Sequence, residues 1–215
     1  MIVINLKTYK EATGKNAVEI AKKCEKYKNI LIAAQLSDIY RITKETKTAV
    51  IAQHIDAARQ GRDTGFVTAE AVKEAGAVGT LINHSEHQLP FEAIKRTIER
   101  AKENKLITIV CADTPEKAAE IAKLNPDYIA IEPPELIAGD ISVSTAKPEI
   151  ITNTIKSVNK IKKIPVLCGA GIKSRQDVKK AIELGAKGVL VASGIVKAEN
   201  QEKAIKEIAE GLREH

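Results

Sequence analysis

The chain alternates short, almost continuously apolar runs with longer segments in which apolar residues recur every three or four positions. Eight runs are rich in β-branched residues, and most are apolar on both faces: residues 2–6, 30–34, 48–53, 78–82, 106–111, 127–131, 164–168 and 188–192. Such runs are typical of parallel strands that are buried on both sides. We therefore expect eight parallel strands covered by helices.

The segments between these runs have the periodicity of amphipathic helices. Their apolar stripes comprise Ala17, Ile20, Ala21 and Cys24; Phe91, Ile94, Ile98 and Ala101; Val178, Ala181 and Ile182; and Ala204, Ile205, Ile208, Ala209 and Leu212. Each stripe covers one helix face, which would pack on the sheet. Eight units in 215 residues leave roughly 27 residues each, near the lower limit for a closed (β/α)8 barrel. Some outer helices must be shortened or missing, and residues 37–47 are the shortest candidate.

A doubly wound open sheet would also alternate strands and helices, but it usually has a glycine-rich phosphate loop after an early strand. Here the first run ends in Asn5-Leu6-Lys7, without a glycine. The pair Gly169 and Gly171 comes late, and Ser174 stands where a third glycine is needed. No linker divides the sequence, so we expect one barrel domain over residues 1–215.

The carboxyl ends of all strands meet at one rim of such a barrel, so polar residues that follow different strands become neighbours. Asn5 and Lys7 end the first run on the same side of the strand, and Glu132 ends the sixth. Pro133-Pro134 then stops regular structure, and Gly139 permits a large backbone rotation. This arrangement is typical of a hinged lid over a catalytic base. Taken alone, the stretch fits better with an ordinary strand-to-helix loop in which Glu132 is a solvated surface charge.

His84 follows the fourth run, and Ser85 with Gln88 matches a capping box, which predicts a helix start directly after His84. The positive potential at a helix N terminus disfavours a charged imidazole, so we expect His84 to be neutral and to donate a hydrogen bond. We interpret His54 as a rim or interface residue and His87 as a surface residue.

Small residues follow the seventh and eighth runs, as Gly169-Ala170-Gly171 and Ala192-Ser193-Gly194. They would let backbone N–H groups approach a tetrahedral anion, which barrels often bind after these two strands. The alternative is that these glycines only make tight strand-to-helix turns.

The formal net charge is +6, but the basic residues alternate with glutamates and only 3% of residues are aromatic. This pattern favours solvated helix faces over a nucleic-acid surface, and the mild basic excess suits an anionic metabolite. No apolar run reaches the length of a membrane span, and the N terminus lacks a basic region. Cys24, Cys111 and Cys168 lack metal-ligand spacing and indicate reduced thiols in the cytoplasm.

Together, Asn5-Leu6-Lys7, His84-Ser85-Glu86, Glu132-Pro133-Pro134 and the two late glycine loops resemble the triosephosphate isomerase family, in the short form found in archaea. The resemblance covers nearly the whole chain. It implies a TIM barrel that interconverts dihydroxyacetone phosphate and D-glyceraldehyde 3-phosphate in glycolysis and gluconeogenesis. It also implies no metal or organic cofactor and a homotetramer.

The resemblance implies roles for individual residues. Glu132 matches the general base, His84 the neutral electrophile, and Lys7 the cation that stabilises the enediolate. The positions implied in substrate binding are Asn5, Lys7, Ile137, Ala138, Gly139, Gly171, Ala192 and Ser193. Glu86 matches a supporting active-site glutamate, and Thr64 matches the residue that reaches into a neighbouring subunit's site.

The chain departs from the commoner family pattern at several places. Leu6 replaces an aromatic residue, Glu135 replaces a bulky aromatic early in the lid, and Ala138-Gly139-Asp140 replaces Gly-Thr-Gly at its end. Cys168 and Gly171 stand where many relatives have the tyrosine and serine that hold the closed lid. We therefore expect a different contact to hold the lid shut.

Two other functions fit part of the pattern. Another phosphate-binding barrel isomerase or lyase, acting on a larger phosphorylated sugar, would share the late glycine loops without needing Lys7, His84 and Glu132 together. A barrel without catalytic activity that binds anions or nucleic acid would use the basic surface alone.

Overall fold

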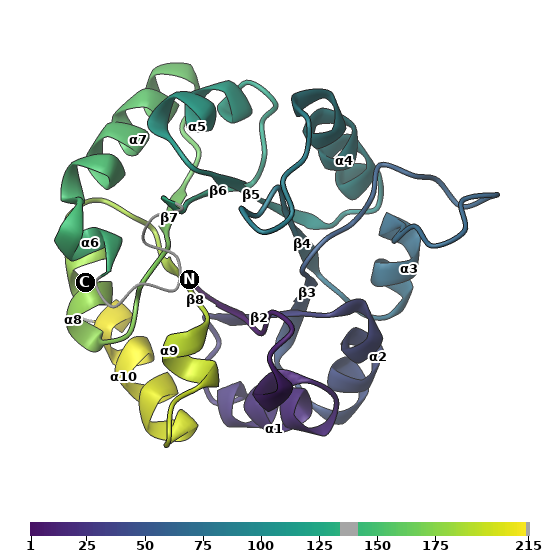
Figure 1. The fold of residues 1–215 in the computed structure, drawn as a ribbon, viewed down its shortest axis with the longest axis horizontal. Helices are drawn as coiled ribbons and strands as arrows, with labels where there is room; N and C mark the ends of the chain where they lie inside the picture. Colours follow the sequence, from purple (N-terminus) through teal and green to yellow (C-terminus); the bar gives the residue numbers. More distant parts are fainter. Residues whose placement is uncertain (134–141, 214–215) are drawn as a thin grey trace.

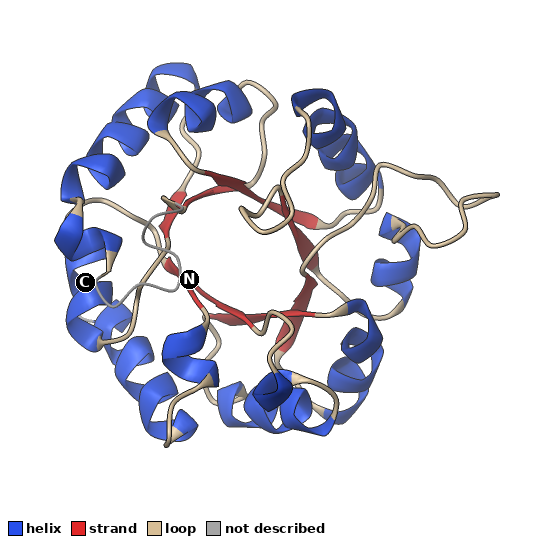
Figure 2. Cartoon of the chain, in the orientation of Figure 1, coloured by secondary structure: helices blue, strands red, loops and turns tan. Residues whose placement is uncertain are grey.

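The computed structural model describes residues 1–133 and 142–213, and it forms a closed barrel of eight parallel strands in sequence order. Figure 1 shows the strands as an inner ring with the helices outside, and Figure 2 separates the two layers by colour. The strands are β1 Ile2–Asn5, β2 Ile30–Ala34, β3 Ala49–Ala52, β4 Gly79–Ile82, β5 Ile107–Ala112, β6 Tyr128–Ile131, β7 Val166–Cys168 and β8 Val189–Val191. Each strand lies inside its predicted run or extends it by one residue. The (β/α)8 prediction is confirmed, and pairing of Ile2 with Val189 closes the sheet and excludes the open alternative.

The barrel interior is one apolar cluster to which all eight strands contribute. Its buried members are Val3, Ala33, Ile51, Leu81, Ile109, Cys111, Ala130, Leu167 and Leu190. Their neighbours along the strands, such as Ile2 and Ile4, pack outward with the helices. The strands are therefore apolar on both faces, as expected. Because alternate residues point inward, Asn5 and Glu132 continue the inward-facing series of their strands at the rim.

The helices cover the outside of the barrel. They are α1 Lys15–Cys24, α2 Leu36–Glu45, α3 Ala69–Glu74, α4 Phe91–Glu103, α5 Pro115–Ala122, α6 Val143–Ala146, α7 Pro148–Ile161, α8 Arg175–Glu183, α9 Ser193–Val196 and α10 Gln201–Arg213, with a short 3-10 turn η1 Lys10–Ala12. Ala17, Ile20, Ala21 and Cys24 of α1 are all buried, as their spacing predicts. The first residue of α4, Phe91, was expected in a buried stripe but is 41% exposed.

The prediction that residues 37–47 hold the shortest helix is wrong. Helix α2 has ten residues; Ile39 and Ile42 are fully buried, and the Asp38 carboxylate accepts a hydrogen bond from Gly14 N at 3.0 Å. The shortened unit follows β3 instead. Residues 53–68 form an extended loop that projects from the barrel (Figure 1), and α3 after it has only six residues.

Within residues 1–133 and 142–213, every helix is too short or too polar to cross a lipid bilayer.

Candidate active site

Residues from five strand ends line one cavity of about 460 Å³ at the carboxyl rim of the barrel. It is lined by Asn5, Lys7, Tyr9, His84, Glu132, Ala170, Gly171, Ile172, Leu190, Val191, Ala192 and Ser193. The fold thus brings together the three residues predicted to be catalytic and the small-residue loops predicted to bind an anion. Tyr9 and Ile172 also line the cavity, and no sequence motif had marked them.

Lys7 is held at the rim by its backbone as much as by its side chain. Its φ of +48° is unusual for a non-glycine residue, and this left-handed conformation turns the chain sharply just after β1. The Lys7 N–H donates to Asn5 Oδ1 at 3.0 Å, and its carbonyl accepts from Gln53 Nε2 at 3.0 Å. The ammonium donates to Glu86 Oε1 at 2.7 Å. These contacts fix the cation near the mouth of the cavity.

The predicted helix start after His84 is wrong, because Ser85 lies in a turn and α4 begins only at Phe91, after Pro90. His84 is nevertheless held as a hydrogen-bond donor by a local contact. The backbone N–H of Glu86 donates to His84 Nδ1 at 3.1 Å. A nitrogen that accepts this bond carries no proton, so the proton of the neutral ring resides on Nε2.

Asn83 holds the His84 turn against the next strand. Its φ is +60°, its Nδ2 donates to the Cys111 carbonyl at 2.9 Å, and its Oδ1 accepts from Leu89 N at 2.9 Å. The side chain therefore replaces the helix cap that the sequence had suggested, and it fixes the direction from which the imidazole enters the cavity.

Glu132 is a buried carboxylate, only 6% exposed, at the first position after β6. Its backbone N–H continues the barrel ladder by donating to the Ala112 carbonyl at 2.9 Å. Its Oε2 lies 3.4 Å from His84 Nε2, and within the described residues it has no hydrogen-bond donor. Burial raises the pKa of the Glu132 carboxyl, although the nearby His84 ring, a hydrogen bond from Cys111 and the positive charge of Lys7 oppose this effect.

Cys111, on β5, is a site residue that no sequence motif had indicated. Its side chain is buried and donates to the Glu132 carboxylate. Burial raises the pKa of the Cys111 thiol well above its ordinary value, and the neighbouring carboxylate raises it further, so the thiol keeps its proton. Cys111 pairs across the sheet with Ala130, two residues before Glu132, so the inward alternation of both strands brings the two side chains together.

Gly169 leaves the space that the base occupies. A Cβ atom at this position would lie 2.8 Å from both Cγ and Oε1 of Glu132. Any larger residue would displace the carboxylate, so the glycine that follows β7 has a packing role in addition to its role in the turn.

The two late loops meet beside the cavity. Gly171 has a φ of +73°, a conformation that favours glycine, and a Cβ atom on Gly194 would lie 2.7 Å from the Ile172 carbonyl. Ala192 and Ser193 line the cavity where α9 begins, and the first N–H groups of a helix have no partner within it. The arrangement offers backbone donors to an anion.

The remaining predicted residues lie elsewhere. Glu86 is at the rim, with its side chain 55% exposed and paired with Lys7. Thr64 is exposed on the projecting loop, away from the cavity of its own chain. The predicted lid residues Ile137, Ala138 and Gly139 lie outside the described residues.

A second, more open cavity of about 580 Å³ adjoins the first and shares Asn5, Lys7 and His84 with it. His54 and His87 line it, and their rings stack with centroids 4.1 Å apart. His87 is exposed, as predicted, and the stack joins the loops that follow β3 and β4.

Comparison with known proteins agrees with this geometry. The family model described as triosephosphate isomerase matches residues 1–209. The triosephosphate isomerase of Methanothermus fervidus is 47% identical over 214 residues, which cover 97% of this chain and 96% of that protein. The corresponding proteins of Methanocaldococcus jannaschii and Archaeoglobus fulgidus are 47% and 44% identical, covering 97% of this chain and 98% and 96% of their own lengths. This chain belongs to the triosephosphate isomerase family.

Proposed function

We propose that this protein interconverts dihydroxyacetone phosphate and D-glyceraldehyde 3-phosphate, as a cytoplasmic enzyme of glycolysis and gluconeogenesis that uses no metal or organic cofactor. Family membership supports the reaction. The observation that carries the assignment of residues is the convergence of Lys7, His84 and Glu132 on one cavity beside two loops rich in small residues. This pairing of a glutamate base with a neutral histidine is the one known for the family, so it is not an independent finding.

Glu132 is the general base. It removes a proton from the carbon next to the substrate carbonyl and returns it to the adjacent carbon, so the carboxylate is regenerated in each turnover. Burial raises its pKa toward the working pH, which makes it a stronger base than an exposed glutamate. Its Oε2, which lacks a donor within the described residues, is the atom available to take the proton.

His84 and Lys7 stabilise the negative charge that develops on the substrate oxygens. The Nε2–H of the neutral His84 ring donates to the carbonyl oxygen, and the Lys7 ammonium supplies the positive charge. Glu86 holds the Lys7 ammonium at the rim, and the more negative substrate replaces Glu86 as its partner when it binds. Asn5, which accepts the Lys7 backbone N–H, keeps this group in register with the cavity.

The phosphate group binds to backbone N–H groups near Gly171, Ala192 and Ser193. Their side chains are small enough to let the backbone approach an anion, and the net charge of +6 favours the encounter. The segment with Ile137, Ala138 and Gly139 stays a predicted lid that completes the phosphate grip. Its purpose is to keep water from the enediolate phosphate, which can otherwise lose its phosphate group.

Isomerase activity tests the proposal directly, in a coupled assay that starts from each triose phosphate in turn. Glu132→Gln removes the base, and Glu132→Asp withdraws the carboxylate by one methylene. We expect kcat to fall by about 10² to 10⁴ for both variants with a small change in KM. Glu120→Gln, at an exposed position on α5, is the matched control. Full turnover by the Glu132 variants would exclude Glu132 as the base.

Binding measurements separate this function from the two alternatives. An enediolate mimic of the phosphoglycolate type should bind more tightly than either substrate, because the site is complementary to the intermediate. A larger phosphorylated sugar that reacts in place of the trioses would favour a related isomerase or lyase. Salt-sensitive binding of duplex DNA without a response to the mimic would favour the non-catalytic barrel.

The active assembly proposed here is a homotetramer. Large apolar side chains are exposed on the described surface at Leu36, Tyr40, Phe66, Phe91 and Ile161, and subunit contacts would cover them. Thr64 on the projecting loop would reach a neighbouring subunit's cavity, and the open cavity that Lys7, His54 and His87 line is the proposed place for it. Light scattering should give four times the mass of one chain, and a monomer would refute the assembly.

A further inference from the structure

The loop between β7 and α8 carries Gly171, and hydrogen bonds hold this loop on both sides of the glycine. On one side, the Ala170 carbonyl accepts the Val143 N–H at 3.1 Å. On the other side, the Lys173 N–H donates to Oδ2 of Asp177 at 3.1 Å. Gly171 therefore lies between two fixed points of the backbone.

Asp177 is the third residue of α8 and belongs to a capping box at the start of this helix. Its N–H donates to Ser174 Oγ at 3.2 Å, and its Oδ2 accepts the Ser174 N–H at 2.9 Å. This exchange satisfies two backbone groups at the helix start. Because the capping box uses only one oxygen of the carboxylate, the second oxygen, Oδ1, can bond to another segment.

The start of α6 supplies that second contact. The Ser142 hydroxyl donates to Oδ1 of Asp177 at 2.6 Å, and Ser144 Oγ donates to the Asp177 carbonyl at 3.1 Å. Ser142 is only 3% exposed, and Ser144 is wholly buried. One aspartate thus joins residues 142–144 to the loop after β7. We call the following set the Asp177 network: Ser142, Lys173, Ser174 and Asp177.

The Asp177 carboxyl is held in its charged form. Burial raises its pKa, but the hydrogen bonds from Ser142, Lys173 and Ser174 outweigh burial and hold the pKa below its ordinary value. A charged carboxylate only accepts hydrogen bonds, and bonds to an ionised group are stronger than those between neutral groups. The carboxylate therefore holds the loop more firmly than a neutral side chain would.

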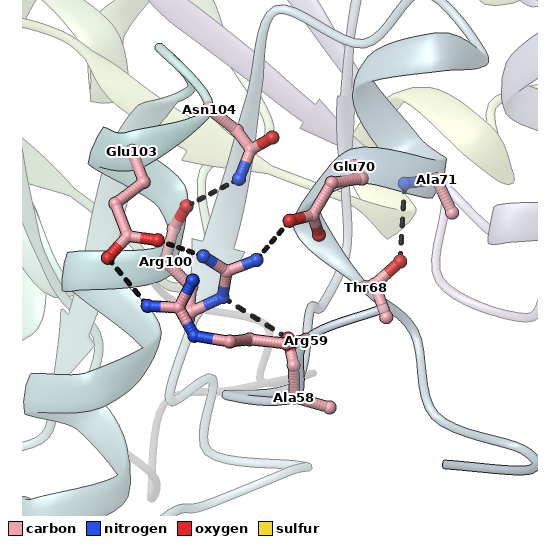
Figure 3. Close-up of polar contacts among 8 residues, drawn as sticks. All are labelled: Ala58, Arg59, Thr68, Glu70, Ala71, Arg100, Glu103 and Asn104. Carbon is pink, nitrogen blue, oxygen red and sulfur yellow. Dashed lines mark hydrogen bonds and ion pairs between the residues drawn. The ribbon is translucent and has the colours of Figure 1, made fainter. Parts of the chain in front are cut away.

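Not every polar cluster of the described chain lies near the active site. Figure 3 shows a cluster around Arg100 of α4 that also joins separate segments. The buried Arg100 guanidinium forms ion pairs with Glu70 of α3 and Glu103 of α4, and its Nε donates to the Ala58 carbonyl at 3.3 Å. None of these four residues lines either cavity at the rim. The Asp177 network, in contrast, directly follows the loop residues that line the first cavity.

We propose that Asp177 is a positioning residue for phosphate binding. By joining the loop after β7 to residues 142–144, its carboxylate keeps Gly171 where the N–H can bond to the phosphate group of the substrate. The inference rests on the proposed function, in which the phosphate binds near Gly171. Among the described residues Asp177 does not line the cavity, so it acts through the loop and not on the substrate. A misplacement of about 1 Å can cost about 100-fold in rate, so the support of the loop matters.

Three variants test this role against the wild-type protein. Asp177→Asn keeps the shape of the side chain but places an amide with two N–H groups among the donors of the network. Asp177→Glu keeps the charge and is an acidic residue that can close a capping box. Ser142→Ala removes the bond between the two segments and leaves the capping box of α8 in place.

Asp127→Asn is the matched control, because Asp127 also joins separate segments through its carboxylate. Its Oδ2 accepts hydrogen bonds from N and Oγ1 of Thr108, both at 2.8 Å. Asp127 directly precedes β6, so it lies at the amino end of that strand, away from the rim with the cavities. This variant should lose stability, as Asp177→Asn should, but it should keep its affinity for phosphate.

Two measurements separate phosphate binding from the rest of the reaction. Inorganic phosphate and an enediolate mimic of the phosphoglycolate type are titrated by calorimetry and as competitive inhibitors of the isomerase assay. D-Glyceraldehyde, which has the carbonyl but no phosphate group, is then incubated in deuterium oxide, and NMR follows exchange of the hydrogen next to its carbonyl. A merely structural role would lower both activities, whereas a positioning role affects only the phosphorylated ligands.

For Asp177→Asn we expect the dissociation constants of inorganic phosphate and of the mimic to rise by about tenfold or more, with a parallel rise in KM for glyceraldehyde 3-phosphate. Deuterium exchange into D-glyceraldehyde should stay close to the wild-type rate. Ser142→Ala should show a smaller loss of the same kind, and Asp177→Glu should lie nearer to the wild type than Asp177→Asn.

Wild-type affinity for phosphate in Asp177→Asn or in Ser142→Ala would overturn the inference, and so would an equal loss of activity toward substrates with and without phosphate. If Asp177→Asn does not fold, Ser142→Ala decides the question by the same measurements. Failure of the proposed function looks different, because a wild-type protein that isomerises neither triose phosphate refutes the reaction itself. An active wild-type protein whose phosphate affinity the variants leave unchanged keeps that function and loses only the role of Asp177.

Discussion

The Nε2 atom of His84 lies 3.4 Å from Oε2 of Glu132, although the two residues follow strands β4 and β6, which are not neighbours in the sheet. At this separation the imidazole nitrogen and the carboxylate oxygen are almost in contact with each other. A proton donor and a proton acceptor thus face the same small volume. Substrate bound there can be polarised by one and deprotonated by the other.

The tautomer of His84 can be measured. Because the Glu86 N–H donates to Nδ1, we expect nitrogen NMR of the labelled protein at pH 8 to show an unprotonated Nδ1 and a protonated Nε2. Glu86→Gln is the control, because it keeps the backbone N–H that donates to Nδ1 and should leave the tautomer unchanged. Glu86→Pro would remove this donor but would also change the turn. A ring protonated at Nδ1 would contradict the assigned role of His84 as donor.

Gly169→Ala should disturb the base without straining the backbone through a left-handed φ. The added Cβ would lie 2.8 Å from Glu132 Cγ and Oε1, so the carboxylate must move. A displacement near 1 Å costs about 100-fold in rate, and we expect kcat to fall by that order. Combining the change with Glu132→Asp supplies a control, because the shorter acid leaves room for the methyl group. Strictly additive losses in the double variant would argue against this contact.

The raised pKa of Glu132 predicts a cost in stability at neutral pH. A folded-state pKa above the ordinary 4.5 means that the folded protein binds this proton more tightly than the unfolded chain. The group's stabilising contribution is therefore complete below its unfolded pKa and is lost as pH rises through the raised value. Glu132→Gln should melt at a higher temperature than the wild type at pH 8, by about 2–4 °C per kcal/mol.

Calorimetry at a series of pH values checks this expectation. The difference in Tm between Glu132→Gln and the wild type should narrow as the pH falls toward 4, where the wild-type carboxyl also becomes neutral. Glu120→Gln, exposed on α5, should show no such trend. If the difference in Tm between the two proteins does not change with pH, ionisation of the Glu132 carboxyl is not what lowers the stability of the wild type.

The Cys111 thiol should tune the base. It donates to the Glu132 carboxylate and thereby opposes the rise in the carboxyl pKa that burial causes. Cys111→Ala removes this donor, so the pH at which kcat/KM falls on the acid side should move upward. Cys111→Ser keeps a donor and should restore much of the wild-type profile. Identical profiles for the alanine variant and the wild type would show that the contact has no influence on the base.

The sequence located the strands well and the helix boundaries less well. Runs such as residues 30–34 are short and apolar on both faces, as is typical of strands buried on both sides, so their positions could be inferred from the local sequence pattern. The length of α2 was underestimated, and one of the contacts that holds this helix, the hydrogen bond from Gly14 to Asp38, joins residues distant in sequence. The capping pattern at Ser85 and Gln88 had no helix to cap, because Pro90 delays α4 to Phe91.

The sequence by itself determined that Lys7, His84 and Glu132 follow strands of a parallel barrel, and the rule that such strand ends share one rim then places them together. Only the tertiary structure decided which atoms meet. The proton on His84 Nε2, the Cys111 thiol beside Glu132 and the burial of Arg100 all depend on pairing between segments that are far apart in the chain. Local patterns encode strand, helix and turn, whereas these contacts depend on register and side-chain packing, which are fixed only when the barrel closes.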